Sequence, residues 1–185
     1  MSVSPLFFGL LGWLLLYEKQ GLAAGCLAAS LIHECGHLSI LFLRRAYPKS
    51  IVVGMFGMRI EREEGLHLPF WDDLLIAAGG PLANLLCCAV FMLLGREQAA
   101  AIHLVMALFN MHPMELLDGG QMLLAGLYHH MSRERAERLL LIVSVLTLFP
   151  LGVAGFLVFF QSGCSVSLLA VDAYLTVLLI FRRKR

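Results

Sequence analysis

The sequence is poor in charge and lacks an excess of either sign. Only 15% of its 185 residues are charged and 59% are hydrophobic, whereas soluble domains are about half apolar and about a quarter charged. The formal net charge is +1, so no strongly basic surface for nucleic acid is expected. This balance predicts a membrane protein, with the lipid bilayer as its surroundings and no nucleic-acid partner.

The sequence also lacks cysteines at paired spacings. The five cysteines lie in apolar stretches and lack the spacing of a disulfide framework or a zinc ribbon. We therefore expect buried thiols that act as small hydrophobic side chains. They are Cys26, Cys35, Cys87, Cys88 and Cys164.

Long apolar runs, separated by charged segments, fill most of the chain. A spanning helix needs about 20 residues. The first run is short and lacks the basic start of a signal peptide, so we interpret it as a retained span, and the fourth run is broken in its middle. We predict an α-helical polytopic membrane protein with about six transmembrane helices, forming a single domain over residues 1–185. The runs are 1–17, 20–43, 74–95, 98–131, 139–160 and 163–181.

Lysine and arginine gather on one side of these predicted spans. If the N-terminus is cytoplasmic, all but two of the 14 basic residues fall in cytoplasmic segments, the exceptions being Lys19 and Arg96. Basic residues are enriched in the cytoplasmic loops of membrane proteins. The pattern predicts a multi-pass protein of a cell membrane, which we take to be bacterial, with both termini in the cytoplasm.

Residues 50–64, SIVVGMFGMRIEREE, differ from the helical pattern. Ile51, Val52 and Val53 are β-branched, two glycines interrupt helical continuity, and residues 58–61 alternate between apolar and polar. The segment predicts a small β-hairpin between the second and third spans, near the cytoplasmic face.

Residues 31–38, LIHECGHL, place polar chemistry inside an apolar run. His33 and His37 are four residues apart, so their rings share one helix face and can reach one metal ion. With Glu34 they form the H-E-x-x-H pattern of two zinc ligands and a general base. Ionisable residues inside a span are costly and usually functional. We predict one Zn²⁺ per chain with Glu34 as the catalytic base; the alternative is a pair of histidines hydrogen-bonded between helices.

A catalytic zinc needs a third protein ligand and an open position. Apart from Glu34, the acids within the predicted spans are Glu115, Asp118 and Asp172. Pro113 interrupts the fourth span, and we expect the helix to restart near it with Glu115 in the first turn. Asp118 precedes two glycines that permit close approach of another helix. We predict Asp118 as the third ligand and an interhelical hydrogen bond for Asp172.

Two amides and the remaining histidines are further candidate polar residues. Asn84 follows a glycine pair that permits close helix packing, and it should face the bundle interior. There it would position substrate, stabilise an oxyanion or simply join two helices. Asn110 can form hydrogen bonds with backbone groups freed at the break. His112 is close to Asp118, but a fourth protein ligand would close the zinc site, so its direct involvement is an open alternative. We assign four histidines to interfaces or packing: His67, His103, His129 and His130.

Four segments, taken in order, resemble the intramembrane site-2 proteases. They are IHECGH, GMFGMRIEREE, AAGGPLAN and FNMHPMELLDGG. The resemblance covers nearly the whole chain and is closest to the six-span bacterial branch that includes the stage IV sporulation protein FB. Departures from the family pattern at His112 and Glu115 concern substrate fit rather than the zinc ligands. The resemblance implies that His33, His37 and Asp118 hold zinc, that Glu34 is the base, and that Asn84 and Asn110 handle substrate.

The function that this resemblance implies is regulated intramembrane proteolysis. A zinc metalloendopeptidase would hydrolyse a peptide bond within or next to the membrane span of its substrate. Its partners would be a membrane-spanning or membrane-associated protein substrate, together with regulatory membrane proteins. The alternative is a zinc transporter or a metal-sensing membrane protein. An inactive relative that binds membrane proteins is a further alternative, which the intact Glu34 disfavours.

Overall fold

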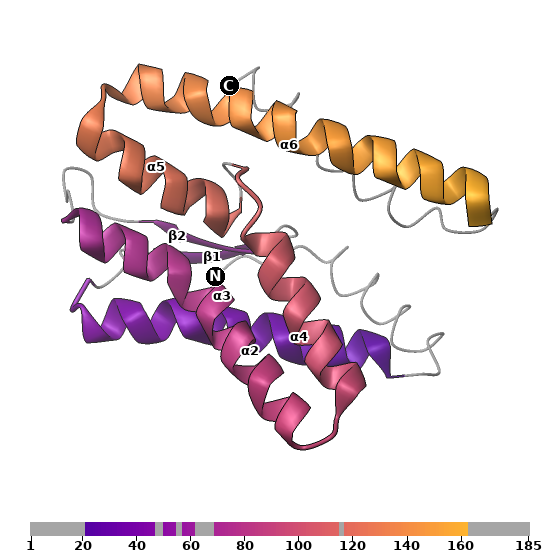
Figure 1. Ribbon diagram of the computed structural model, residues 1–185. Coiled ribbons are helices and arrows are strands. Elements are labelled where there is room, and N and C mark those ends of the chain that lie inside the picture. Colours follow the sequence, from indigo (N-terminus) through magenta and orange to yellow (C-terminus); the bar gives the residue numbers. More distant parts are fainter. Residues whose placement is uncertain (1–20, 47–49, 55–56, 62–68, 115–116, 163–185) are drawn as a thin grey trace.

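Five helices and one pair of strands make up the part of the chain that the structure describes (Figure 1). The computed structural model describes residues 21–46, 50–54, 57–61, 69–114 and 117–162. The predicted spans at 1–17 and 163–181 lie outside these residues. The elements are α2 (Leu22–Leu43), β1 (Ser50–Gly54), β2 (Gly57–Glu61), α3 (Phe70–Leu93), α4 (Glu97–Asn110), α5 (Asp118–His130) and α6 (Arg133–Ser162).

Helix α3 is the central element of this arrangement. It packs against α2, α4 and α5, while α6 packs against α5. Figure 1 shows α6 at the top above α5, with α2, α3 and α4 below them and α3 crossing α2. Side chains from α2 and α5, which are distant in sequence, therefore meet beside α3.

Strands β1 and β2 occupy the segment in which the sequence predicts two strands. They pair antiparallel, with Ser50 opposite Glu61 and Gly54 opposite Gly57. The turn residues 55–56 lie outside the described part of the chain. Because β1 begins shortly after α2 ends, the pair connects the histidine-bearing helix to α3.

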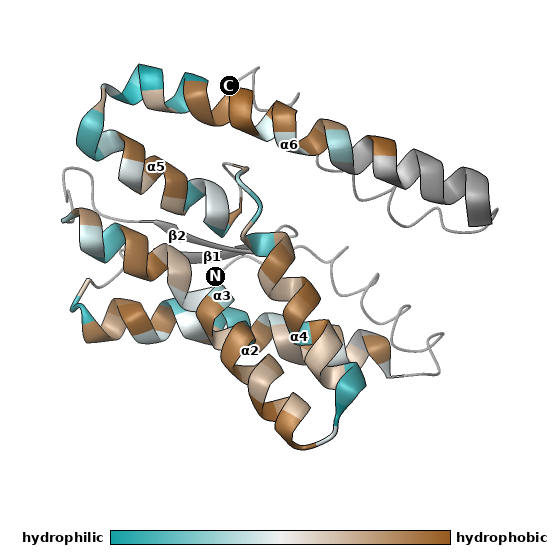
Figure 2. Ribbon diagram, in the orientation of Figure 1, coloured by the Kyte–Doolittle hydropathy of each residue, from teal (hydrophilic) through white to brown (hydrophobic). Residues whose placement is uncertain are grey.

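Two of the described helices are long and apolar enough to cross a membrane. These segments are Ala24–Leu43 and Phe70–Leu93. Large apolar side chains on both are exposed, among them Leu31, Phe42 and Leu93, and Figure 2 shows hydrophobic residues along much of each helix. A helix on the surface of a soluble protein keeps its apolar residues on one buried face. The predicted number of six spans is not reached within the described residues and stays a prediction.

The expectation of buried thiols is wrong for the cysteines that the structure describes. Cys26 and Cys35 are exposed on α2, and Cys87 and Cys88 are partly exposed on α3. An apolar thiol needs no burial in protein where the helix surface around it is itself apolar. Cys164 lies outside the described residues.

Helices α2 and α3 touch through their backbones. A Cβ atom added at Gly36 would lie 2.8 Å from the Cβ of Ala83, and one added at Gly79 would lie 2.8 Å from the carbonyl oxygen of Gly36. Real side chains do not tolerate such separations. The prediction that the glycines of α3 permit close helix packing is confirmed, and small residues of this kind are typical of contacts between membrane helices.

The end of α2 is joined to the start of α3. The guanidinium of Arg44 pairs with the carboxylate of Asp72, which is buried and lies in the first turn of α3, where the helix dipole favours a negative charge. Beneath this pair Leu41, Ala46 and Ile76 form a small apolar core. These contacts set the position of α2 along α3.

A break separates α4 from α5, and the second helix starts later than the sequence predicts. The expectation of a restart near Pro113 is wrong, because α5 begins at Asp118. Pro113 and Met114, which lie between the two helices, instead contact α6. Met114 and Leu148 are buried together, and the Oγ atom of Ser144 lies 2.8 Å from the carbonyl oxygen of Pro113. A helix through this segment would give up both contacts.

Candidate metal centre

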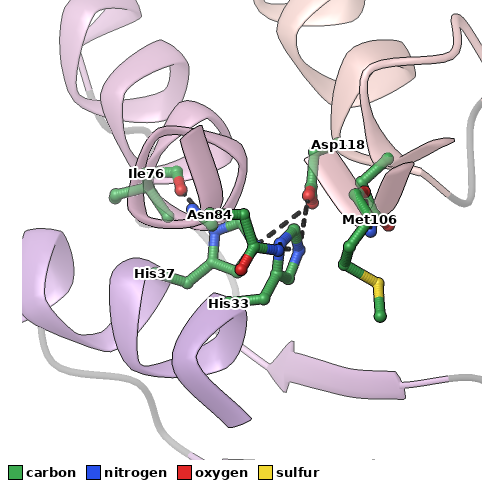
Figure 3. A network of polar contacts seen from close by, with 8 residues as sticks. His33, His37, Ile76, Asn84, Met106 and Asp118 are labelled. Carbon is green, nitrogen blue, oxygen red and sulfur yellow. Dashed lines mark hydrogen bonds and ion pairs between the residues drawn. The ribbon is translucent and has the colours of Figure 1, made fainter. Parts of the chain in front are cut away.

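His33 and His37 lie on one face of α2, buried among the helices. Their relative exposures are 5% and 7%, and the two Nε2 atoms are 3.2 Å apart. The predicted spacing of four residues therefore brings both ring nitrogens to a single point. Figure 3 shows the two rings turned toward the start of α5.

Asp118 reaches the same point from α5. One carboxylate oxygen, Oδ2, lies 2.9 Å from Nε2 of His33, and the other, Oδ1, lies 3.3 Å from Nε2 of His37. The carboxylate is in the first turn of α5, where the helix dipole favours its negative charge. The structure thus brings together the three residues that the sequence predicts as metal ligands.

The distances within this group fit one zinc ion. Two ligands of a tetrahedral zinc, each about 2.0–2.1 Å from the metal, are about 3.3 Å apart. The Oδ2 atom of Asp118 is buried and lies 2.9 Å from Nε2 of His33. A cation bound between the three side chains would be contacted by the carboxylate and by both ring nitrogens. Two imidazoles and one carboxylate also match a catalytic zinc site that keeps one position open.

The ring of His37 is held in the orientation that a metal ligand needs. Its Nδ1 atom lies 2.7 Å from the carbonyl oxygen of Ile76 in α3. Since a carbonyl oxygen only accepts, Nδ1 carries the ring hydrogen, and the lone pair of Nε2 points toward His33 and Asp118. A backbone carbonyl that fixes a ligand histidine in this way is a common feature of metal sites.

Gly80 provides the space for the rings. A Cβ atom added there would lie 2.6 Å from both Cε1 and Nε2 of His33, and it would also clash with the ring of His37. Any larger residue at this position would displace the two imidazoles. The sequence indicated close packing at this glycine, but not that its neighbours are the ligand side chains.

Asn84 is completely buried beside the centre. Its Nδ2 atom lies 3.1 Å from Nδ1 of His33, and its Oδ1 atom lies 2.9 Å from Nδ1 of His103. The expectation that Asn84 faces the bundle interior is confirmed. His103, which we assigned to interfaces or packing, is buried in α4 and stacks on Phe91 with ring centroids 5.4 Å apart, but it also bonds Asn84. A polar ring in an otherwise apolar stretch of α4 was the sequence signal for this contact.

The other candidate residues are placed as follows. Glu34 lies in α2 between the two histidines and is half-buried. Asn110 ends α4, where its Nδ2 atom donates to the carbonyl of Met106 at 3.0 Å. His112 lies in the break, and its Nε2 atom is buried without a hydrogen-bond partner. Glu115 and Asp172 lie outside the described residues, so the prediction for Asp172 is not tested.

Comparison with known proteins gives a likeness in fold. No protein-family model and no curated protein matches the chain. Among solved structures, the site-2 protease from Methanocaldococcus jannaschii superposes with a TM-score of 0.68 at 17% sequence identity, over 92% of this chain and 82% of that one. At this level of sequence identity, the likeness establishes a shared backbone fold and nothing more. The chain therefore has the fold of a site-2 protease.

Proposed function

We propose that this protein is an intramembrane zinc endopeptidase that hydrolyses a peptide bond within or next to the membrane span of a membrane-associated substrate. The observation that carries the proposal is the convergence of His33, His37 and Asp118. Their ligand atoms lie within 4.8 Å of one another, and Glu34 lies in the same turn of α2. The fold shared with a site-2 protease supports it.

The depth of the centre supports chemistry inside the bilayer. Arg44 and Arg45 directly follow α2, and at 1.5 Å per residue His37 and His33 lie about 10 Å and about 16 Å below Arg44. The exposed apolar side chains of α2 and α3 are suited to contact with lipid. We include in the proposal six spans, a bacterial cell membrane, and cytoplasmic termini on the side of the centre.

The residues of the centre have distinct tasks in this reaction. A zinc ion held by His33, His37 and Asp118 would polarise the scissile carbonyl and make a water molecule more acidic. Glu34 takes the proton of the attacking water and later delivers it to the leaving amine. The Ile76 carbonyl keeps the His37 ring oriented, and the packed helices keep bulk water away from the charged groups.

The strand pair offers a way to hold the substrate extended. A helix hides its peptide bonds within its own hydrogen bonds, so a substrate must unwind before cleavage. In the described part of the chain the sheet has two strands, and each has one edge that no described strand covers. A peptide could pair with such an edge as an added strand.

Proline substitutions test this grip, because proline cannot donate to a strand ladder. Single replacements from Val52 to Ile60 should impair cleavage at alternating positions while zinc content and protein level stay unchanged. Full activity in every variant would rule out the edge as the substrate grip. A loss of activity that follows protein level would make the hairpin a folding element.

The roles of Asn84 and Asn110 in substrate handling stay predictions. Both amides make hydrogen bonds inside the protein, Asn84 to the two histidine rings and Asn110 to its own helix.

A zinc transporter is the second candidate function. A transporter passes its ion along a series of ligand groups that cross the membrane. Within the described residues one group of three or more potential ligands is found, at a single depth. This clustering favours the enzyme over the transporter.

Glu34→Gln tests the enzymatic function. The glutamine keeps the size of the side chain but cannot accept the proton, so cleavage should fall by about 10²–10⁴-fold. Co-expression with single-span candidate substrates, followed by measurement of cleavage and of zinc content, checks this. Zinc content should stay at the wild-type level. A Glu34→Gln protein that cleaves as fast as wild type would exclude the proposed base, and a matching loss of zinc would make Glu34 a ligand instead.

A further inference from the structure

A chain of three buried polar side chains leads from the metal centre into α4. His33, Asn84 and His103 are 5%, 0% and 4% exposed. The amide of Asn84 bridges the two rings, with contacts of 3.1 Å to Nδ1 of His33 and 2.9 Å to Nδ1 of His103. Each histidine therefore presents the same ring atom to opposite ends of one amide.

The direction of the hydrogen bonds along this chain depends on the orientation of the amide. Oxygen and nitrogen of an asparagine side chain have nearly the same size, so the group can be turned without altering its packing. With Nδ2 toward His33, the amide donates to Nδ1 of that ring. The hydrogen of the His33 ring then sits on Nε2, the atom that faces His37 and Asp118.

A metal ligand requires the opposite direction. To bind a metal through Nε2, the His33 ring must carry its hydrogen on Nδ1, and that hydrogen needs an acceptor. The oxygen of Asn84 fills this need once the amide is turned. The Nδ2 atom then faces His103, whose Nδ1 must accept, so the hydrogen of the His103 ring must sit on Nε2.

We propose that His103 is a positioning residue for the metal centre. By accepting from Nδ2 of Asn84, it holds the amide oxygen toward His33 and so keeps Nε2 of His33 available to the metal. Stacking on Phe91 fixes the ring plane of His103 for this task. The inference rests on the zinc site of the proposed function.

Zinc affinity of four purified proteins tests the coupling. Competition with a chromogenic chelator would compare wild type, Asn84→Leu, His103→Phe and the double variant. Loss of Asn84 should weaken zinc binding by about 10–100-fold, as for other residues that orient metal ligands, and loss of His103, which acts through Asn84, should weaken it less. Because His103 acts through Asn84, the double variant should bind like Asn84→Leu. A double variant in which the two losses multiply would overturn the proposal.

Two further variants separate positioning from packing. His103→Gln keeps an oxygen that can accept from Asn84, so it should recover most of the lost affinity. His130→Phe serves as a matched control, because His130 is exposed at the end of α5 and its replacement should leave zinc affinity unchanged. If His103→Gln binds zinc no better than His103→Phe, the loss does not come from the missing acceptor, and the proposed positioning role is overturned.

Nitrogen NMR of the histidine rings tests the inference in wild-type protein, so it does not require a variant to fold. In zinc-loaded wild-type protein, the hydrogen should be on Nδ1 of His33 and on Nε2 of His103. A hydrogen on Nδ1 of His103 would overturn the inference while leaving the zinc site intact. A wild-type protein that binds no zinc would instead overturn the proposed function together with the inference.

Discussion

Two helix contacts in this molecule are built in opposite ways. Helices α2 and α3 meet through glycines, and their backbones touch at Gly36 and Gly79. Helices α5 and α6 meet through side chains, with Leu124, Ala136 and Leu140 buried between them. The first contact borders the buried polar groups of the metal centre, while the second is an apolar cluster.

The difference indicates how the fold accommodates ionisable residues among apolar helices. Because Gly80 has no side chain, the space beside it is filled by the imidazoles of His33 and His37. The close approach also brings the carbonyl of Ile76 within 2.7 Å of His37. The leucine contact has no such task, and it buries apolar side chains between α5 and α6.

The largest effect on zinc binding from altering either contact is expected for Gly80→Ala. The added methyl would lie 2.6 Å from Nε2 of His33, so the ligand rings must move. Zinc affinity should fall by more than about 100-fold, beyond the usual effect of a residue that only orients a ligand. Chelator competition on purified protein measures this.

Gly126→Ala is the matched control for this prediction. A Cβ atom at Gly126 has no neighbour within 4 Å, so its affinity for zinc should equal that of wild type. Wild-type affinity in Gly80→Ala as well would mean that the rings do not bind metal in the arrangement described here.

A smaller effect on zinc is expected for Leu140→Ala in the other contact. Leu140 is 1% exposed, and truncation of a buried leucine typically costs about 2–5 kcal/mol of stability. Denaturant or thermal unfolding in detergent should reveal this loss, while the folded protein keeps its zinc affinity. If zinc affinity fell in parallel with that of Gly80→Ala, the two contacts would not have separate tasks.

The ligand set was predictable because its signals are local. The spacing of His33 and His37 fixes a shared helix face whatever the rest of the fold does. Asp118 was predicted from its place after a helix break and before two glycines. The strands over residues 50–61 were also predicted, from alternation and β-branched residues.

The remainder of the centre depends on contacts that leave no trace in a short sequence window. The partner of His37 is a backbone carbonyl, which every residue has, so nothing distinguishes Ile76. The segment before α5 contacts Ser144 and Leu148 of α6 through Pro113 and Met114, and these contacts join residues far apart in the sequence. The contact between His103 and Asn84 depends on α3 and α4 lying side by side, which no local pattern predicts.

The central claim is that His33, His37 and Asp118 hold one zinc ion. Metal analysis of wild-type protein and Asp118→Ala, both purified with zinc and then dialysed without it, tests this most directly. We predict about one zinc per chain in wild type and almost none in Asp118→Ala, because the carboxylate is one of three protein ligands. Equal zinc contents in the two proteins, or none in wild type, would contradict the account.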